Sequence, residues 1–228
     1  MKNKTTIAIS LDPSIGIDMM DYLEELNGFD NIMVHLDIMD GKFVAREAVT
    51  IDEYTHVVQN SRHKIDVHLM VAKPSEVVNI YLAKAIWGSI NSLSFHVEPF
   101  EKEADAAVSI LKKIKVMGIQ AGVVVDLNTR VEDVQQELLK NSDVITIMSV
   151  KCGASGQSFN PSALQKIIWI RKNHPHLRII VDGGINARNI NTVMEAGADT
   201  AVVGSALYSA GDRAGELLVF SKNTEKRS

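Results

Sequence analysis

The chain has a single cysteine, Cys152, among its 228 residues. One thiol cannot form an internal disulfide, which excludes the class of small secreted domains held together by disulfides. A reducing cytoplasm is therefore the expected location. Because a free thiol is most often buried beside apolar neighbours, we interpret Cys152 as a small apolar filler, with a redox-sensitive thiol as the alternative.

Long apolar runs and a strong charge of either sign are also missing. No apolar run approaches the roughly 18–20 residues that a membrane span needs, and the basic N-terminus meets Asp12 and Pro13 too soon to hold a signal-peptide core. The formal net charge is −4 and the isoelectric point is about 6.0. We therefore expect neither a nucleic-acid partner nor a membrane partner.

The sequence is rich in short aliphatic segments. Apolar residues make up 46% of it, which suits one globular domain with a sizeable core. Eight segments, several of them dense in Val and Ile, are typical of strands buried on both faces of a parallel sheet. They are Thr6–Leu11, Asn31–Asp37, Lys64–Met70, Ser92–Val97, Gln120–Val125, Val144–Val150, Leu177–Val181 and Thr200–Val203.

Stretches with helical spacing of apolar residues separate these segments. Some carry terminal signals, such as proline in the first turn at Pro74 and glycine after the last turn at Gly118 and Gly197. The predicted helices are Asp18–Leu26, Pro74–Ala85, Glu101–Met117, Val131–Leu139, Pro161–Lys172, Ala187–Ala196 and Asp212–Phe220.

Strand and helix alternate along the whole chain without a Gly/Ser/Pro-rich linker. This rhythm predicts an α/β protein with a single (β/α)8 TIM barrel in residues 1–220, and an open doubly wound sheet is the alternative. The last eight residues, 221–228, are polar and charged, so we expect a loose C-terminal tail there.

Polar residues cluster at the ends of the predicted strands. His35 and Asp37 alternate in the second strand and therefore point to the same face, while His68 ends the third and Asp182 the seventh. In a TIM barrel the carboxyl ends of all strands meet at one rim, so these four side chains converge. Two imidazoles and two carboxylates suit a divalent ion such as Zn²⁺, Mn²⁺ or Fe²⁺. Buried structural histidines beside strand-ending aspartates are the alternative.

The other histidines are assigned more modest roles. His96 ends a strand, and we interpret it as a core histidine or as a support for the metal ligands. We expect the remaining four on the surface, in helical or loop contexts: His56, His63, His174 and His176.

Glycine-bearing segments follow the last three predicted strands. Glycines after the seventh and eighth strands of a TIM barrel commonly let backbone N–H groups approach a phosphate, so these turns predict a phosphate site, although tight turns alone also use glycine. No Walker loop or dinucleotide fingerprint is present, so a nucleotide is not implied. The segments are Cys152–Gln157, Asp182–Ile185 and Val203–Ala206.

Three methionines, Met39, Met70 and Met148, come from three predicted strands and point to the same mouth of the barrel. Methionine commonly fills irregular gaps in a core. Around a metal and two carboxylates it would also exclude water.

Taken in order, these motifs resemble the ribulose-phosphate 3-epimerase family. The resemblance extends from Ile7 to Leu207, and the pairing of HxDxMDG with DxHLM is its most specific part. The motifs are VHLDIMDG at 34–41, DVHLMV at 66–71, FHVE at 95–98, MSVKCGASGQSF at 148–159, VDGGI at 181–185 and VGSAL at 203–207.

The resemblance implies a metal-dependent epimerase that inverts C3 of a ketose phosphate, interconverting D-ribulose 5-phosphate and D-xylulose 5-phosphate. It implies one divalent ion, Zn²⁺, Fe²⁺, Mn²⁺ or Co²⁺ with Zn²⁺ favoured, held by His35, Asp37, His68 and Asp182. Asp37 and Asp182 would act as the two bases, one on each face, through a metal-stabilised enediolate. It also hints at a homo-oligomer.

The resemblance further implies a set of residues that bind the substrate. Ser10 and His68 would contact the sugar, and the three methionines would line the pocket. The phosphate would lie against three glycine-bearing turns. In this chain the residues of these turns are Gly153, Ala154, Ser155, Gly156, Gly183, Gly184, Gly204 and Ser205.

Three loops depart from the family pattern. Ala45-Arg46 replaces Pro-Asn after the second strand, Cys152–Ser155 replaces P-G-F-G, and Asp126–Asn128 replaces the usual L-N-P-G region. Because these loops cover the substrate while the metal positions are intact, the choice of sugar stays open. A roomier pocket would admit a ketohexose 6-phosphate such as D-allulose 6-phosphate. A non-catalytic sugar-phosphate-binding protein is the third hypothesis.

Overall fold

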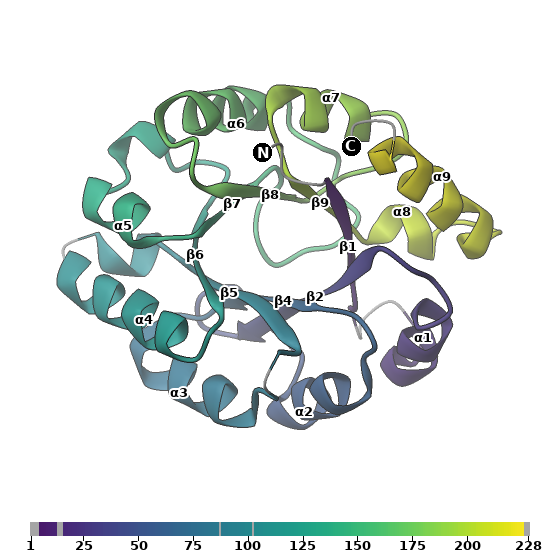
Figure 1. Cartoon of the computed structure of the whole chain (residues 1–228), viewed down its shortest axis with the longest axis horizontal. Helices are drawn as coiled ribbons and strands as arrows, with labels where there is room; N and C mark the ends of the chain where they lie inside the picture. Colours follow the sequence, from purple (N-terminus) through teal and green to yellow (C-terminus); the bar gives the residue numbers. More distant parts are fainter. Residues whose placement is uncertain (1–4, 13–15, 87, 102, 226–228) are drawn as a thin grey trace.

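The computed structural model describes residues 5–12, 16–86, 88–101 and 103–225, with side chains described up to 220. Eight parallel strands close into a barrel that helices surround (Figure 1). The barrel is closed because β1 (Thr6–Ser10) pairs with both β9 (Thr200–Val203) and β2 (Ile32–Asp40). The predicted (β/α)8 barrel is confirmed. One further strand, the two-residue β3 (Glu47–Ala48), pairs antiparallel with β2 at the rim.

The strands agree closely with those predicted from the sequence. Gln120–Val125 and Thr200–Val203 have the predicted bounds, and the second strand is longer at its carboxyl end, where it pairs with β3. The strands are β1 (Thr6–Ser10), β2 (Ile32–Asp40), β3 (Glu47–Ala48), β4 (Ile65–Met70), β5 (Ile90–His96), β6 (Gln120–Val125), β7 (Val144–Met148), β8 (Arg178–Asp182) and β9 (Thr200–Val203).

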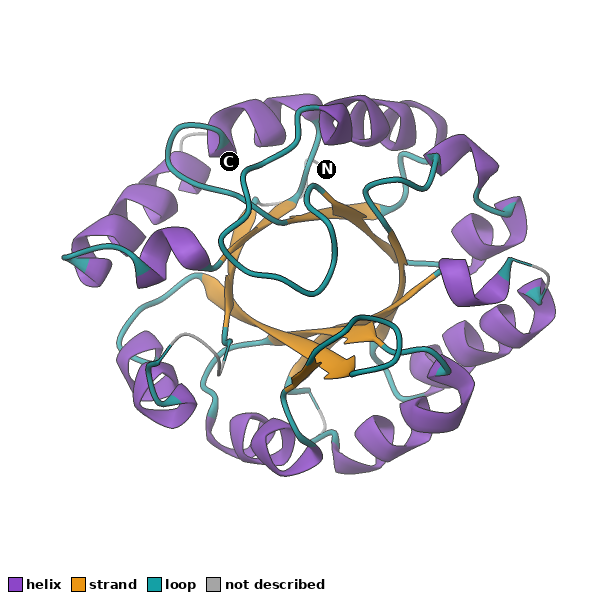
Figure 2. Ribbon diagram, turned by 180° about the vertical axis from the view of Figure 1, so that it is seen from behind, coloured by secondary structure: helices purple, strands orange, loops and turns teal. Residues whose placement is uncertain are grey.

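The helices cover the outside of the barrel and bury one apolar face each. Figure 2 shows the ring from the opposite side, with loops crossing the barrel mouth. The α-helices are α1 (Met19–Leu26), α2 (Ile51–Asn60), α3 (Pro74–Lys84), α4 (Ala104–Val116), α5 (Gln136–Asn141), α6 (Ser162–Asn173), α7 (Ile190–Ala196), α8 (Ser205–Tyr208) and α9 (Arg213–Glu225). The 3-10 helices are η2 (Glu98–Phe100) and η3 (Val131–Asp133).

Four helical features differ from the sequence expectation. Helix α2 was not predicted, nor was the short α8. Residues Val131–Leu139 form a 3-10 turn and then a short α-helix in place of one continuous helix. Helix α9 continues to Glu225, beyond the predicted end at residue 220 and into the segment expected as a tail. Residues 226–228 lie outside the described part of the chain.

Helix α2 has a clear local signal that apolar spacing alone missed. Thr50 accepts a hydrogen bond from the backbone N–H of Glu53, and the Glu53 carboxylate accepts one from the Thr50 backbone. This reciprocal capping box satisfies two donors at the start of the helix. The helix buries Tyr54, Val57 and Val58 against the barrel.

The inside of the barrel is filled in layers. Ala8, Met33, Val144, Ile180 and Val202 form a separate buried apolar cluster. Ser10, His35 and Asp182 come two residues after Ala8, Met33 and Ile180, and therefore lie on the same face of their strands, nearer the mouth. The apolar layer closes the barrel below them, so chemistry is confined to the carboxyl end of the strands.

Among the described residues, no helix combines the length and apolar character that crossing a bilayer requires.

Candidate active site

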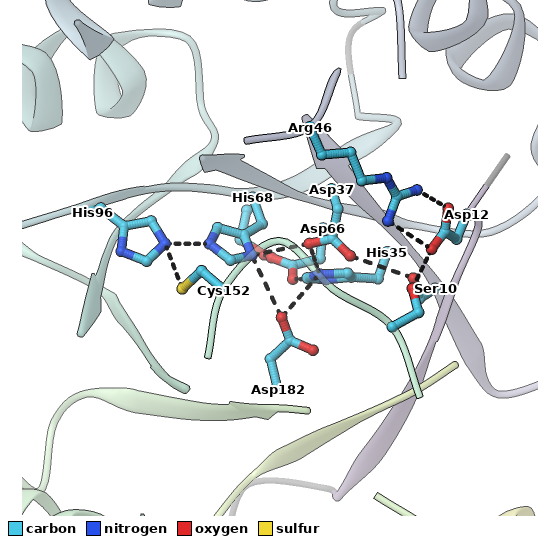
Figure 3. Close-up of polar contacts among 12 residues, drawn as sticks. Ser10, Asp12, His35, Asp37, Arg46, Asp66, His68, His96, Cys152 and Asp182 are labelled. Atoms are coloured by element: carbon cyan, nitrogen blue, oxygen red, sulfur yellow. Dashed lines mark hydrogen bonds and ion pairs between the residues drawn. The ribbon is translucent and has the colours of Figure 1, made fainter. Parts of the chain in front are cut away.

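Four side chains from three strands meet at the carboxyl end of the barrel. His35 and Asp37 lie on β2, His68 on β4 and Asp182 at the end of β8 (Figure 3). The parallel register places Asp37 directly beside His68. One possible ligand atom from each residue lies within 4.8 Å of the others, so the structure brings together the four residues predicted to bind metal.

The two histidines face the two carboxylates. Nε2 of His35 lies 3.1 Å from Oδ1 of Asp37 and 3.7 Å from Oδ2 of Asp182. Nδ1 of His68 lies 3.0 Å and 3.4 Å from the same two oxygens. Both histidines are fully buried. Each therefore presents one ring nitrogen to the same small space.

The charges in this cluster depend on one another. Burial lowers the pKa of His35 and His68, but the neighbouring carboxylates outweigh it and raise both, that of His68 to about 9. Burial raises the pKa of the two aspartates, yet the histidines hold both below their usual range. Without a cation, protons on the imidazoles compensate the buried carboxylates.

The ring nitrogens that point away from the cluster have partners of their own. Nδ1 of His35 lies 2.7 Å from the buried carboxylate of Asp66, which also accepts a hydrogen bond from Ser92. Nε2 of His68 lies 2.9 Å from Nε2 of His96. His96, which the sequence left between a core and a supporting role, is fully buried between His68 and Glu98.

These outer partners define which ring nitrogen carries the proton. If Nδ1–H of His96 donates to Glu98, its Nε2 is left to accept from Nε2–H of His68. Asp66 accepts from Nδ1–H of His35 in the same way. In both histidines the remaining lone pair then points into the cluster, as a metal ligand requires.

The donor set fits a divalent cation. Imidazole nitrogens and carboxylate oxygens suit Zn²⁺ and related transition ions, and such a cation would replace the positive charge that the two imidazolium protons otherwise provide. His35, Asp37, His68 and Asp182 would hold it.

A cavity opens above the four residues. It contains about 600 Å³ of empty space, open solvent included, and Asp37 and Asp182 are among the residues that line it. The remaining wall includes every predicted substrate-binding residue except His68, which is buried. These residues are Ser10, Met39, Met70, Met148, Gly153, Ala154, Ser155, Gly156, Gly183, Gly184, Gly204 and Ser205.

The glycine turn after β8 depends on glycine for conformational and steric reasons. Gly183 and Gly184 have φ of +114° and +65°. A Cβ on Gly184 would lie 2.3 Å from the backbone nitrogen of Phe159. These backbones therefore pack closely against each other at the cavity wall, where a side chain would push them apart.

Several residues of the cavity were missed by sequence reasoning or interpreted differently. Asp12 was not singled out, yet Arg46 binds it with two guanidinium nitrogens and Ser155 donates to it. Cys152 packs beside apolar residues but also lies 3.0 Å from Oδ1 of Asp126, and burial raises the pKa of its thiol far above the usual range. Its neutral thiol argues against the redox-sensitive alternative.

Asp66 and Glu98, which contact His35 and His96, carried a weak sequence signal. Asp66 lies two residues before His68, and Glu98 two residues after His96. The first pair shares the inward face of β4. Among the histidines expected on the surface, His174 is buried at the end of α6, so that expectation was wrong for it.

Comparison with known proteins gives a consistent result. The model of the ribulose-phosphate 3 epimerase family matches residues 6–208. The chain belongs to this family. Its relatives include the ribulose-phosphate 3-epimerase of Aquifex aeolicus, 33% identical over 79% of each chain, and that of Mycobacterium bovis, 34% identical over 90% of this chain and 86% of the relative. The rice cytoplasmic isoform is 31% identical over 84% and 82%. These relatives are isomerases that act on carbohydrates.

Solved structures of other enzymes share the architecture of this family member. The 3-hexulose-6-phosphate synthase of Salmonella typhimurium superposes with a TM-score of 0.71 over 98% of this chain and 100% of its own, at 15% identity. The thiamine phosphate pyrophosphorylase of Pyrococcus furiosus gives 0.62 over 99% and 98%, also at 15% identity. At this identity the likeness shows the barrel fold alone.

Proposed function

We propose that this protein is a metal-dependent 3-epimerase that interconverts D-ribulose 5-phosphate and D-xylulose 5-phosphate. The observation that carries the proposal is the convergence of two histidines and two aspartates on one cavity in a member of an epimerase family. The substrate is taken from the names of the relatives.

Two carboxylates in one site supply what inversion requires. Asp37 reaches the cavity from β2 and Asp182 from β8, with β1 and β9 between them in the barrel wall. With one carboxylate ionised and the other protonated, the first removes the proton from C3, and the electron pair moves to the carbonyl at C2. The second then returns a proton to C3 on the other face. A bound divalent ion would supply positive charge beside the oxygens where negative charge develops.

The other walls of the cavity would position the substrate. Gly183-Gly184 and Gly204-Ser205 line the cavity with three glycines and one small hydroxyl side chain, which suits a phosphate group. Met39, Met70 and Met148 supply an apolar wall that would exclude water from the reacting carbon.

We propose one ion per chain, with Zn²⁺ favoured and Fe²⁺, Mn²⁺ or Co²⁺ as alternatives, since the ligand set suits all four. A cytoplasmic location is proposed by analogy with the relative named a cytoplasmic isoform. Self-association into a homo-oligomer also belongs to the proposal.

A coupled assay of the metal-replete protein on ribulose 5-phosphate, joined to elemental analysis, tests the proposal. We expect turnover and about one divalent ion per chain. The same assay on D-allulose 6-phosphate separates the proposal from a 3-epimerase of a longer sugar, through the ratio of kcat/KM. Tight binding of sugar phosphates without turnover or bound metal would instead identify a binding protein.

A further inference from the structure

Two of the loops that depart from the family pattern meet at one carboxylate. Arg46 lies in the loop after β2, Ser155 in the loop between β7 and α6, and Asp12 follows β1. Both guanidinium amino nitrogens of Arg46 contact Asp12, with Nη1 3.2 Å from Oδ2. The Ser155 hydroxyl donates to the same Oδ2. We call these three residues the Asp12 clasp (Figure 3 shows its arginine and aspartate).

The clasp is anchored and partly withdrawn from water. Only 10% of the Asp12 side chain and 22% of the Arg46 side chain are exposed. The backbone N–H of Asp12 donates to the hydroxyl of Tyr208 at 3.0 Å, and this hydroxyl donates to the carbonyl of Ser10. A two-pronged arginine–carboxylate pair in this setting is better defined than an exposed salt bridge.

The β7–α6 loop is held at two points, and the Asp12 clasp is one of them. Near its start, the hydroxyl of Ser149 donates to the carbonyls of Asp182 and Gly183, which fixes the loop to the metal-site end of β8. At its tip, Ser155 is held by Asp12 on the wall formed by β1. Figure 2 shows long loops lying over the barrel mouth, and all three clasp residues line the cavity.

This attachment limits the distance between the phosphate of a bound sugar and its reacting carbon. The tip of this loop and the two aspartates line the same cavity. In the proposed function the phosphate lies against the loop tip and the reacting carbon against Asp37 and Asp182. A six-carbon ketose phosphate places one more carbon between C3 and its phosphate than a five-carbon one does. With the loop held in place, the extra carbon has to displace either the phosphate or the reacting carbon.

We propose that the Asp12 clasp determines substrate specificity by fixing the distance between the phosphate region and the two aspartates. The inference rests on the proposed function and deepens it, since it assigns the choice between five-carbon and six-carbon ketose phosphates to Arg46 and Ser155. The changes in the loop sequences alone suggested a roomier pocket. In the structure, Arg46 and Ser155 together hold these loops against Asp12.

The test compares Ser155→Ala and Arg46→Gln with the wild-type protein, loaded with Zn²⁺. Calorimetry measures binding of ribitol 5-phosphate and allitol 6-phosphate, which share the configuration at C3, have no carbonyl and cannot be epimerised. We expect the wild type to prefer the five-carbon ligand by about tenfold or more, the scale of discrimination for one carbon unit, and each variant to lose most of this preference. Arg46→Lys keeps the charge but not the fork, and should recover only part of it.

Ser158→Ala is the matched control, because it removes a hydroxyl from the same loop outside the wall of this cavity. It should keep the wild-type ratio. The inference is overturned if the wild type binds both ligands equally, or if the clasp variants keep its preference. Failure of the proposed function looks different: neither ketose phosphate is epimerised, whatever the binding ratio.

Discussion

Asp37 and Asp182 bring two carboxylates into a site where burial opposes their ionisation. The imidazoles of His35 and His68 compensate the two negative charges, and in the proposed function a divalent cation does so as well. A purely structural cluster would not need both aspartates at the wall of an open cavity, which both of them line. At the scale of single residues, the chemistry therefore depends on these two side chains.

Asp37→Asn and Asp182→Asn should each lower kcat by roughly 10²–10⁴-fold, since each removes one of the two proton-transfer groups. Steady-state kinetics on ribulose 5-phosphate measures the loss. Asp133→Asn is the control, because its side chain is 67% exposed and lies in η3. Wild-type kcat in either active-site variant would remove that aspartate from the mechanism.

Glu98 gives a prediction about pH. Burial raises its pKa, but the hydrogen bond from His96, with those from Thr129 and the backbone of Asp126, outweighs burial and lowers it to about 2. A pKa lowered by folding stabilises the protein above the unfolded value of 4.5, and this stability is lost as the pH falls toward 2.

Glu98→Gln should therefore cost on the order of 3 kcal/mol near neutral pH, and the difference from wild type should shrink between pH about 4.5 and 2. Urea unfolding across this range measures it. A constant difference at all pH values would show that the carboxylate charge is not what matters. The glutamine should also weaken Zn²⁺ binding by about 10–100-fold. Its one oxygen would serve the two donors Thr129 and the Asp126 backbone, so an amide NH₂ would face Nδ1 of His96 in place of the accepting oxygen.

Among the elements, the strands could be predicted closely from the sequence, whereas some helices could not. Strands buried on both faces leave a dense Val and Ile signal. Helix α2 buries only Tyr54, Val57 and Val58, so its clearest mark is the capping box at its start. Helix α8 has four residues and is too short for any periodicity.

The glycine turn after β8 leads to a prediction at this scale. Gly184→Ala should raise KM for the sugar phosphate at least severalfold, because its Cβ would meet the backbone of Phe159 and displace the β7–α6 loop. Gly197→Ala is the matched control. Gly197 also has positive φ and lies at the C-terminus of α7, but its Cβ would meet the side chain of Arg171 on α6, whereas that of Gly184 would meet backbone atoms.

The control should lose about 1 kcal/mol of stability and keep KM, since it strains only a helix C-terminus. Thermal unfolding and substrate titration of both variants measure the two effects separately. Equal KM values in Gly184→Ala and the wild type would show that this turn does not position the phosphate.

For the whole molecule, barrel closure explains why the site could be inferred from residues far apart in the sequence. Once eight strands are assigned, residues at their carboxyl ends must share one rim, and this brings Asp182 to His35. No such rule predicts the contacts of Asp12 with Arg46 and Ser155. They depend on how three loops fold over the mouth, which strand patterns do not determine.

The bound ion should stabilise the entire barrel, because its ligands come from β2, β4 and β8. Removing it with a chelator should lower Tm, and Zn²⁺ at about 100 times its dissociation constant should restore about 2.7 kcal/mol. Calorimetric scans with and without Zn²⁺ measure this. His68→Gln should largely abolish the restoring effect, whereas His56→Gln, on the exposed face of α2, should keep it.

Proton exchange at one carbon tests the central claim most directly. Metal-replete protein is incubated with ribulose 5-phosphate in D₂O, and the sugar phosphates are examined by NMR. The account predicts solvent deuterium at C3 of the xylulose 5-phosphate formed, because Asp37 and Asp182 exchange the abstracted proton for one from solvent. Product that retains its original C3 hydrogen, or no product at all, would contradict it.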